Sequence, residues 1–127
     1  MEFLNSPSTM GKNLPLSLAV RVRDILYISG MVGIIPGTFQ LAAGGLEGEA
    51  RQTMDNIGAI LKENGLAFHN VFKKAVIMAD ISKPMELNKL FLTYFRPDRM
   101  PASTTFGGAL AFGAQVEVEC WAFVGKS

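Results

Sequence analysis

The chain has 127 residues, enough for one domain with its own core, and its 12 basic and 11 acidic residues leave a net charge of +1. A balance so close to neutral provides no field that would attract nucleic acid or an anionic membrane, so neither is expected as a partner. One Cys and one His exclude a disulfide framework and a metal site with the usual number of ligands. No basic leader precedes an apolar run and no apolar stretch has the length that a bilayer requires, so the expected location is the cytoplasm.

The hydrophobic content of 49% is high for a domain with so much surface to cover. Some apolar side chains are therefore expected to face another subunit, and the alternative is a monomer with an unusually rich core.

In chain order, residues 1–13 are rich in Ser, Thr, Asn and Gly and are expected to form a loose lead-in to a single domain over residues 14–127. Residues 18–22 alternate as a strand does, and Arg23-Asp24 suits a turn. A second strand over residues 25–28 ends at Ser29-Gly30, and a loop rich in Gly follows, with room for one short strand.

The hydrophobic period changes at Leu46 or Glu47, where a helix is expected to begin. Its apolar stripe is formed by Ala50, Met54, Ile57, Ile60 and Leu61, and Gly65 is placed to cap its end.

An apolar run over residues 71–79, interrupted by two lysines, predicts a central strand. Ser82 and Pro84 open a second helix, which Pro97 ends. Two final strands, about 102–110 and 115–124, are expected to be joined by a turn near Gly113. The order β-β-(β)-α-β-α-β-β predicts a two-layer α+β domain, with both helices on one face of a mixed sheet of five or six strands. Other copies of the chain are expected to cover the opposite face in a closed ring.

Two pieces of the chain are candidates for function. Glu117 and Glu119 share one face of the last strand, opposite Val118 and Cys120, because side chains alternate along a strand. This arrangement is typical of a solvated strand face, and the alternative is a carboxyl in a cleft with a raised pKa that exchanges protons with water. Ser29-Gly30 is either a simple strand end or a place where the backbone approaches a ligand.

Five motifs occur in an order that resembles the Rid family, the imine and enamine deaminases of the YjgF and RutC type. The most specific is Ala50-Arg51-Gln52-Thr53-Met54-Asp55-Asn56-Ile57, which is similar to the first-helix signature of that family. The other four are a strand ending in Ser-Gly, a middle strand with its exit, a second helix and a final hairpin; they are found here at residues 27–30, 75–81, 88–95 and 101–119.

The resemblance implies a chorismate-mutase-like fold and a homotrimer with small-molecule sites between subunits, where reactive imines are hydrolysed to ketones and ammonia. It implies that Glu117 is catalytic and orders the attacking water. It also implies that the substrate is bound by a set of residues from three parts of the chain: Ser29, Gly30, Met31, Asn88, Ser103 and Thr105. No cofactor is expected, because the sequence has no glycine-rich phosphate loop after a strand.

This sequence departs from the family pattern at the residue that binds the substrate carboxylate, because Ser103 stands where the family has Arg. A hydroxyl cannot replace the planar fork of an Arg, so a neutral or less acidic substrate is expected unless another cation reaches the site. The candidates for that cation are Arg21, Arg96 and Arg99. Two alternatives to an imine deaminase stay open: a trimer that binds a small ligand or a partner without catalysis, and a different hydrolase on the same scaffold in a catabolic pathway.

Overall fold

A computed structural model of the chain describes residues 1–5 and 15–125. It contains one sheet of six strands in the order β1-β2-β3-β6-β4-β5. Their bounds are β1 Glu2–Leu4, β2 Ala19–Val22, β3 Ile25–Met31, β4 Val71–Met78, β5 Ala102–Gly107 and β6 Val116–Phe123. All neighbouring strands are antiparallel except β4 and β5, which are parallel.

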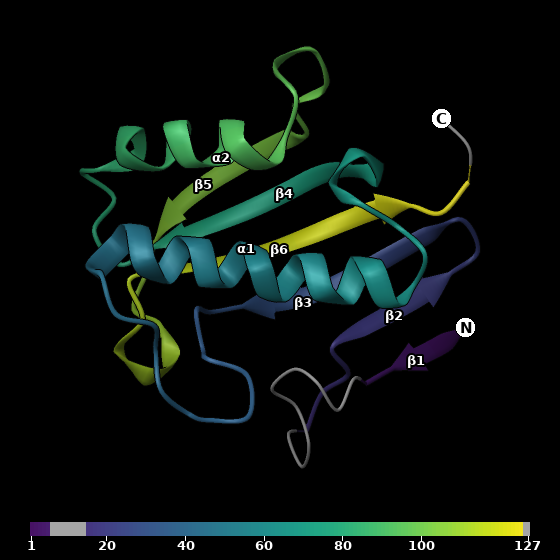
Figure 1. The fold of residues 1–127 in the computed structure, drawn as a ribbon, viewed down its shortest axis with the longest axis horizontal. Helices are drawn as coiled ribbons and strands as arrows, with labels where there is room; N and C mark the ends of the chain where they lie inside the picture. The colour runs from purple at the N-terminus through teal and green to yellow at the C-terminus, as the bar shows by residue number, and fades with distance from the viewer. Residues whose placement is uncertain (6–14, 126–127) are drawn as a thin grey trace.

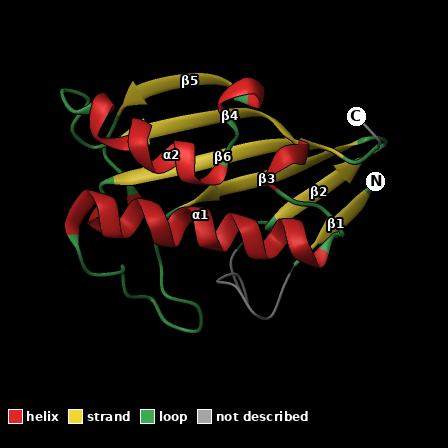
Figure 2. Cartoon of the chain, turned by 45° about the horizontal axis from the view of Figure 1, so that its top comes forward, coloured by secondary structure: helices red, strands yellow, loops and turns green. Residues whose placement is uncertain are grey.

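Two α-helices, α1 (Gly45–Glu63) and α2 (Asn88–Tyr94), lie on the same face of this sheet (Figures 1 and 2). Short 3₁₀ turns lie in the connections between elements: η1 Phe68–Asn70, η2 Pro84–Leu87, η3 Pro97–Arg99 and η4 Ala111–Gly113. The core lies between the helices and the sheet, where Leu26, Ile57 and Val116 are completely buried. The predicted two-layer α+β architecture is confirmed. No helix in the described residues is long and apolar enough to cross a membrane.

The first helix forms as its period predicts. The stripe from Ala50 to Leu61 is buried against the sheet, and the helix begins at Gly45, within two residues of the expected start. At its end, Gly65 has a φ of +73°, which suits a residue without a Cβ. The N–H groups of Gly65 and Leu66 donate to the carbonyl oxygens of Lys62 and Leu61, and these bonds satisfy the last turn.

The expected final hairpin is wrong. Strands β5 and β6 follow one another in the chain, but β4 lies between them in the sheet. The reason is that a helical crossover from β4 through α2 brings β5 back parallel to β4, at the edge of the sheet. Strand β6 then enters between β3 and β4, where it pairs on both sides and becomes a central strand.

Two other elements differ from expectation. Residues 2–4, which fall in the predicted lead-in, form strand β1 and pair with β2; residues 6–14, which include the rest of the lead-in, lie outside the described part of the chain. The second helical segment is divided, because the 3₁₀ turn at Pro84–Leu87 precedes the α-helical residues. Proline suits the first turn of a helix, where its missing N–H costs no hydrogen bond.

Candidate functional site

The Glu117 carboxyl lies against Gly30. Side chains of β6 alternate between core and open face, so Val116 and Val118 are buried beneath the helices while Glu117 lies on the face without helices. A Cβ built at Gly30 would stand 2.7 Å from Glu117 Oε2 and 2.9 Å from its carboxyl carbon. A larger residue at position 30 would therefore force the carboxyl group to move from this place.

A β-bulge produces this close approach. Ile28 pairs with Cys120 and Met31 pairs with Val118, so two residues of β3, Ser29 and Gly30, face a single residue of β6. A bulge of this kind redirects side chains at the end of a strand.

Ser29 and Met31 serve the fold at this bulge. The Ser29 hydroxyl donates to the Ser17 carbonyl oxygen at 2.6 Å, and the Ser29 N–H donates to the Leu18 carbonyl oxygen at 2.9 Å. Met31 is only 3% exposed and packs in the main core, because the bulge returns it to the helix side opposite Val118. Both are expected from the sequence to contact substrate, and that stays a prediction; within this chain the Met31 side chain packs in the core.

The environment of Glu117 favours its neutral form. Burial raises the pKa of the Glu117 carboxyl above its ordinary value of 4.5, and the negative charge of Glu119 on the same face raises it further. A carboxyl with a raised pKa can exchange protons with a bound water nearer to neutral pH.

A second cluster surrounds Ser103 on β5. The Lys74 ammonium donates to Ser103 Oγ at 2.8 Å and lies 4.1 Å from the centre of the Phe91 ring of α2. Lys74 is only 6% exposed, whereas Ser103 is exposed. Burial lowers the pKa of Lys74, and the neighbouring Cys120 has a smaller effect in the opposite direction. Burial also raises the pKa of that thiol to about 12, so Cys120 is a neutral core residue at neutral pH.

Thr105 and Asn88 lie on the same side of the sheet as this cluster. Thr105 pairs with Val76, two residues beyond Ser103, and is exposed. Asn88 begins α2 one turn before Phe91, and its amide donates to Met85 Sδ at 3.3 Å. Their contact with a substrate stays a prediction.

The two clusters face opposite sides of the sheet. Ile77 pairs with both Glu117 and Phe106, which places these three on the open face. Lys74 pairs with Cys120 and Ser103, and these three lie on the helix face. One protomer therefore does not bring Glu117 and Ser103 together, although the sequence motifs place them in one site.

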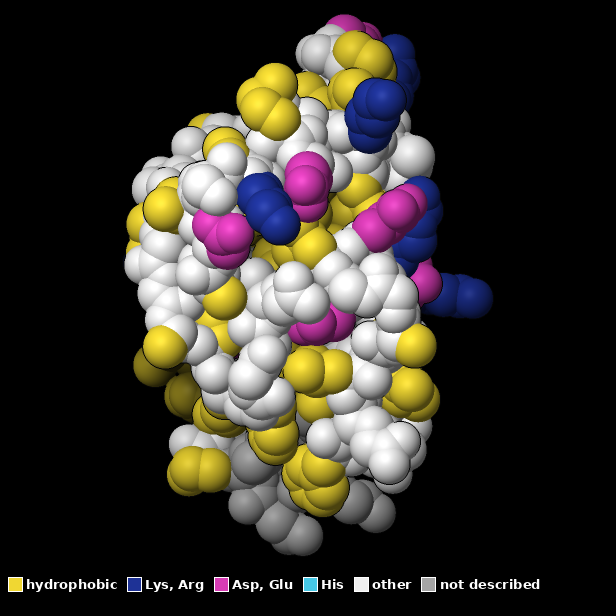
Figure 3. Space-filling view, turned by 90° about the vertical axis from the view of Figure 1, so that its left-hand side faces the viewer, with side chains coloured by type: hydrophobic (Ala, Val, Ile, Leu, Met, Phe, Trp, Pro, Cys, Tyr) yellow, Lys and Arg dark blue, Asp and Glu magenta, His cyan; other side chains and the backbone are white. Residues whose placement is uncertain are grey.

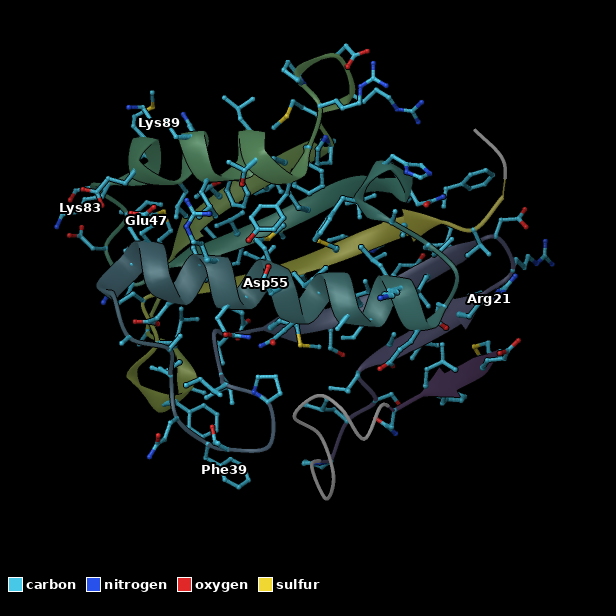
Figure 4. The ribbon with its side chains drawn as sticks, in the orientation of Figure 1. Arg21, Phe39, Glu47, Asp55, Lys83 and Lys89 are labelled. Atoms are coloured by element: carbon cyan, nitrogen blue, oxygen red, sulfur yellow. The ribbon has the colours of Figure 1, made fainter. Side chains whose placement is uncertain are left out.

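The three candidate arginines have other positions or partners in the described part of the chain. Arg21 lies on β2, separated from β5 by three strands (Figure 4). Arg96 pairs with the Asp98 carboxylate at 2.9 Å on the surface. Arg99 lines a separate cavity of about 830 Å³, which also contains the rings of Tyr27, Phe72 and Phe123.

The cation beside Ser103 is Lys74, which the sequence reasoning missed. A signal for it was available: Lys74 interrupts an apolar strand at the same parity as the buried residues Val76 and Met78. Lys73, its neighbour, turns to the open face and lies 5.6 Å from the centre of the Trp121 ring.

The end of the molecule where α1 begins carries charges of both signs. Acidic and basic side chains alternate there with apolar and uncharged ones (Figure 3). The described residues contain no group of three His, Cys, Asp or Glu that could hold a metal ion.

Comparisons with known proteins agree on the family. The family model described as Endoribonuclease L-PSP matches residues 7–124. The chain is 40% identical over 121 residues to the mouse 2-iminobutanoate/2-iminopropanoate deaminase, an alignment that spans 94% of this chain and 87% of that protein. The crystal structure of a Rid-family protein of unknown function from Yersinia pestis is 30% identical, with a TM-score of 0.90 and coverage of 97% and 98%. RidA from an Antarctic Psychrobacter species is also 30% identical, with a TM-score of 0.88 and coverage of 97% and 99%.

Proposed function

The chain belongs to the Rid family, whose model is described as Endoribonuclease L-PSP, and we propose that it is an imine deaminase acting on a small metabolite. The observation that carries this proposal is the Glu117 carboxyl, held against Gly30 and raised in pKa. The relatives named as deaminases of 2-iminobutanoate and 2-iminopropanoate indicate the reaction.

In the proposed reaction, Glu117 removes a proton from a water molecule as its oxygen attacks the carbon of the C=N bond. The same carboxyl then gives that proton to the nitrogen, which leaves an intermediate with one hydroxyl and one amino group. The carboxylate next takes the hydroxyl proton and passes it to the amino nitrogen, so that the C–N bond breaks, ammonia leaves and the carbonyl group forms. Each turnover consumes one imine and one water and forms one ketone and one ammonia. No cofactor is needed for this balance, because no electron leaves or enters the substrate.

The site is proposed to lie between subunits of a homotrimer, with Glu117 and Gly30 from one chain and Ser103, Thr105 and Asn88 from its neighbour. Two facts support this arrangement. The two clusters face opposite sides of one sheet, so they can meet only when two chains associate. The face without helices also exposes large apolar side chains that a second chain would cover: Phe3 at 65%, Tyr27 at 40%, Phe106 at 48% and Phe123 at 37%. We place the protein in the cytoplasm.

Substrate preference is proposed to be altered by Ser103. An Arg binds a carboxylate through two parallel hydrogen bonds, whereas a Ser hydroxyl donates one. We expect weaker discrimination for 2-imino acids than a site with Arg would give.

Ammonia release from enzymatically generated 2-iminobutanoate tests the reaction. We expect the native chain to release ammonia above the rate of spontaneous hydrolysis and Glu117→Gln to fall at least about 100-fold toward that background, since general acid–base catalysis contributes about 10²–10⁴. Gly30→Ala should lose activity for a different reason, because the added methyl group occupies the place of the carboxyl. Gly108→Ala is the matched control, because its Cβ would meet nothing closer than Ile77 Cγ2 at 3.6 Å.

Equal rates for the native chain and Glu117→Gln would exclude this mechanism. No ammonia release above the spontaneous rate, together with measurable binding of 2-oxobutanoate, would favour a ligand-binding protein without catalysis. The absence of Arg at position 103 is the observation that favours this second candidate.

A further inference from the structure

Lys74 has an unusual position for a lysine. It is 6% exposed, and in the described residues none of the ion pairs within 4.0 Å includes it. Its partners are the Ser103 hydroxyl at 2.8 Å and the face of the Phe91 ring at 4.1 Å. A buried ammonium without a carboxylate partner is costly, so the fold keeps this charge at the expense of stability.

The direction of the Lys74–Ser103 hydrogen bond determines what Ser103 can offer a ligand. An ammonium only donates, so Ser103 Oγ is the acceptor and its own proton remains available. Ser103 is exposed and Lys74 is buried behind it. A ligand oxygen that accepts from the Ser103 hydroxyl would therefore meet a donor polarised by a positive charge, which favours an anionic oxygen.

We propose that Lys74 and Ser103 together form the carboxylate-binding group of this site, with the cation supplied from strand β4 and the exposed donor from strand β5. This inference rests on the proposed imine deaminase, and it specifies the substrate as a 2-imino acid held through one carboxylate oxygen. The expectation of a neutral substrate assumed that no cation lies near Ser103, and the structure places one there.

The arrangement also predicts how binding differs from an Arg site. A guanidinium reaches both oxygens of a carboxylate in a fixed plane, whereas Ser103 reaches one oxygen and the Lys74 charge acts from behind it. This contact therefore selects for a negatively charged ligand more strongly than it restricts the orientation of that ligand.

The test compares Lys74→Met and Ser103→Ala with the native chain. Two quantities are measured: the KM and kcat for 2-iminobutanoate, and the Kd of 2-oxobutanoate by calorimetry. We expect Lys74→Met to raise KM and Kd by about tenfold or more, because the Ser103 hydroxyl would lose the positive charge that strengthens its hydrogen bond to a carboxylate, while kcat changes less than KM. Ser103→Ala should raise both in the same direction. Lys62→Met, which removes an exposed lysine at the end of α1, is the charge-matched control and should change neither.

Two further variants show whether charge is the cause. Lys74→Met should not unfold the chain, because it replaces a buried charge by an apolar side chain of similar length, and its melting temperature should equal or exceed the native one. Adding Ser103→Arg to Lys74→Met returns a cation to the site from β5 and should recover the affinity for 2-oxobutanoate.

The outcomes separate this inference from the proposed reaction. Normal turnover with unchanged KM and Kd in Lys74→Met would overturn the inference and leave the deaminase intact. No turnover of any imine, with 2-oxobutanoate binding that disappears in Lys74→Met, would support the inference and reject the deaminase. A Kd that rises equally in Lys62→Met would also overturn it, because the effect would then be that of net charge alone.

Discussion

At the scale of single residues, the position of Glu117 lowers the stability of the folded chain when its carboxyl is ionised. Its carboxyl is partly buried next to Glu119, so the folded chain holds a proton there more tightly than the unfolded chain does. Between the ordinary pKa of 4.5 and the raised pKa of the folded state, the native form therefore binds more protons, and stability falls as pH rises through this window. Above this pH window the carboxyl is ionised in both states, and the loss of stability no longer changes with pH.

This sign gives a prediction for Glu117→Gln. We expect the variant to melt at a higher temperature than the native chain at pH 7 to 8, since a neutral amide avoids the cost of an ionised carboxyl. The difference should shrink as the pH falls and disappear below 4.5, where both side chains are neutral. Thermal melts across this pH range measure it. A Glu119→Gln control should show a smaller gain of the same sign, because it removes the charge that adds to the shift. A difference independent of pH would contradict the argument.

At the scale of elements, α1 fixes the two segments that lead to Glu117 and Gly30. Glu49 is 5% exposed, and its Oε1 accepts from the N–H of Gln115, just before β6 begins. Asn56, 6% exposed, donates to the carbonyl oxygens of Val32 at 3.3 Å and Ile34 at 2.8 Å, just after β3 ends. Two polar side chains on the buried face of one helix thus anchor both ends of the Gly30–Glu117 contact.

We predict that Asn56→Ala lowers the free energy of unfolding by about 1–3 kcal/mol, the usual cost of leaving buried acceptors without a donor. Urea denaturation measures the change. Arg51→Ala is the control on the same helix; it removes an exposed ion pair with Glu47 at 3.1 Å and should cost less than about 1 kcal/mol. Equal losses in the two variants would show that the Asn56 bonds do not hold this segment.

At the scale of the whole molecule, the sheet separates the two halves of the proposed site. Glu117 lies on the face without helices and Ser103 on the face with them, so the proposed site would need two chains. A protein built in this way can be active when each of its chains carries a different defect.

Mixing two impaired variants tests the assembly, with activity measured at substrate concentrations well below KM, where both variants are slow. The two variants Glu117→Gln and Lys74→Met are unfolded together in equal amounts and refolded. Some of the resulting sites should then combine the intact Glu117 of one chain with the intact Lys74 of the other. Random association around a ring leaves about a quarter of the sites intact, so we expect activity up to about a quarter of the native level. Each variant refolded alone is the control. No recovery, in particles that light scattering shows to contain three chains, would place both clusters in one protomer.

The sequence by itself determined the layers, the limits of the first helix and the alternation that sets Glu117 opposite the core. These features depend on local periodicity and turn chemistry, which act over a few residues. The packing of Cys120 as a neutral core residue follows from the same alternation.

Only the tertiary structure decided which strands are neighbours, and this changed the site. The sequence suggested that residues 102–110 and 115–124 form a hairpin, yet β4 lies between them, because pairing partners depend on contacts far apart in the chain. That strand order brings Lys74 to Ser103 and places the bulge at Gly30 against Glu117. Strand parity predicted which side chains of one strand lie on the same face. Only the fold showed which side chains from different strands lie next to each other on that face.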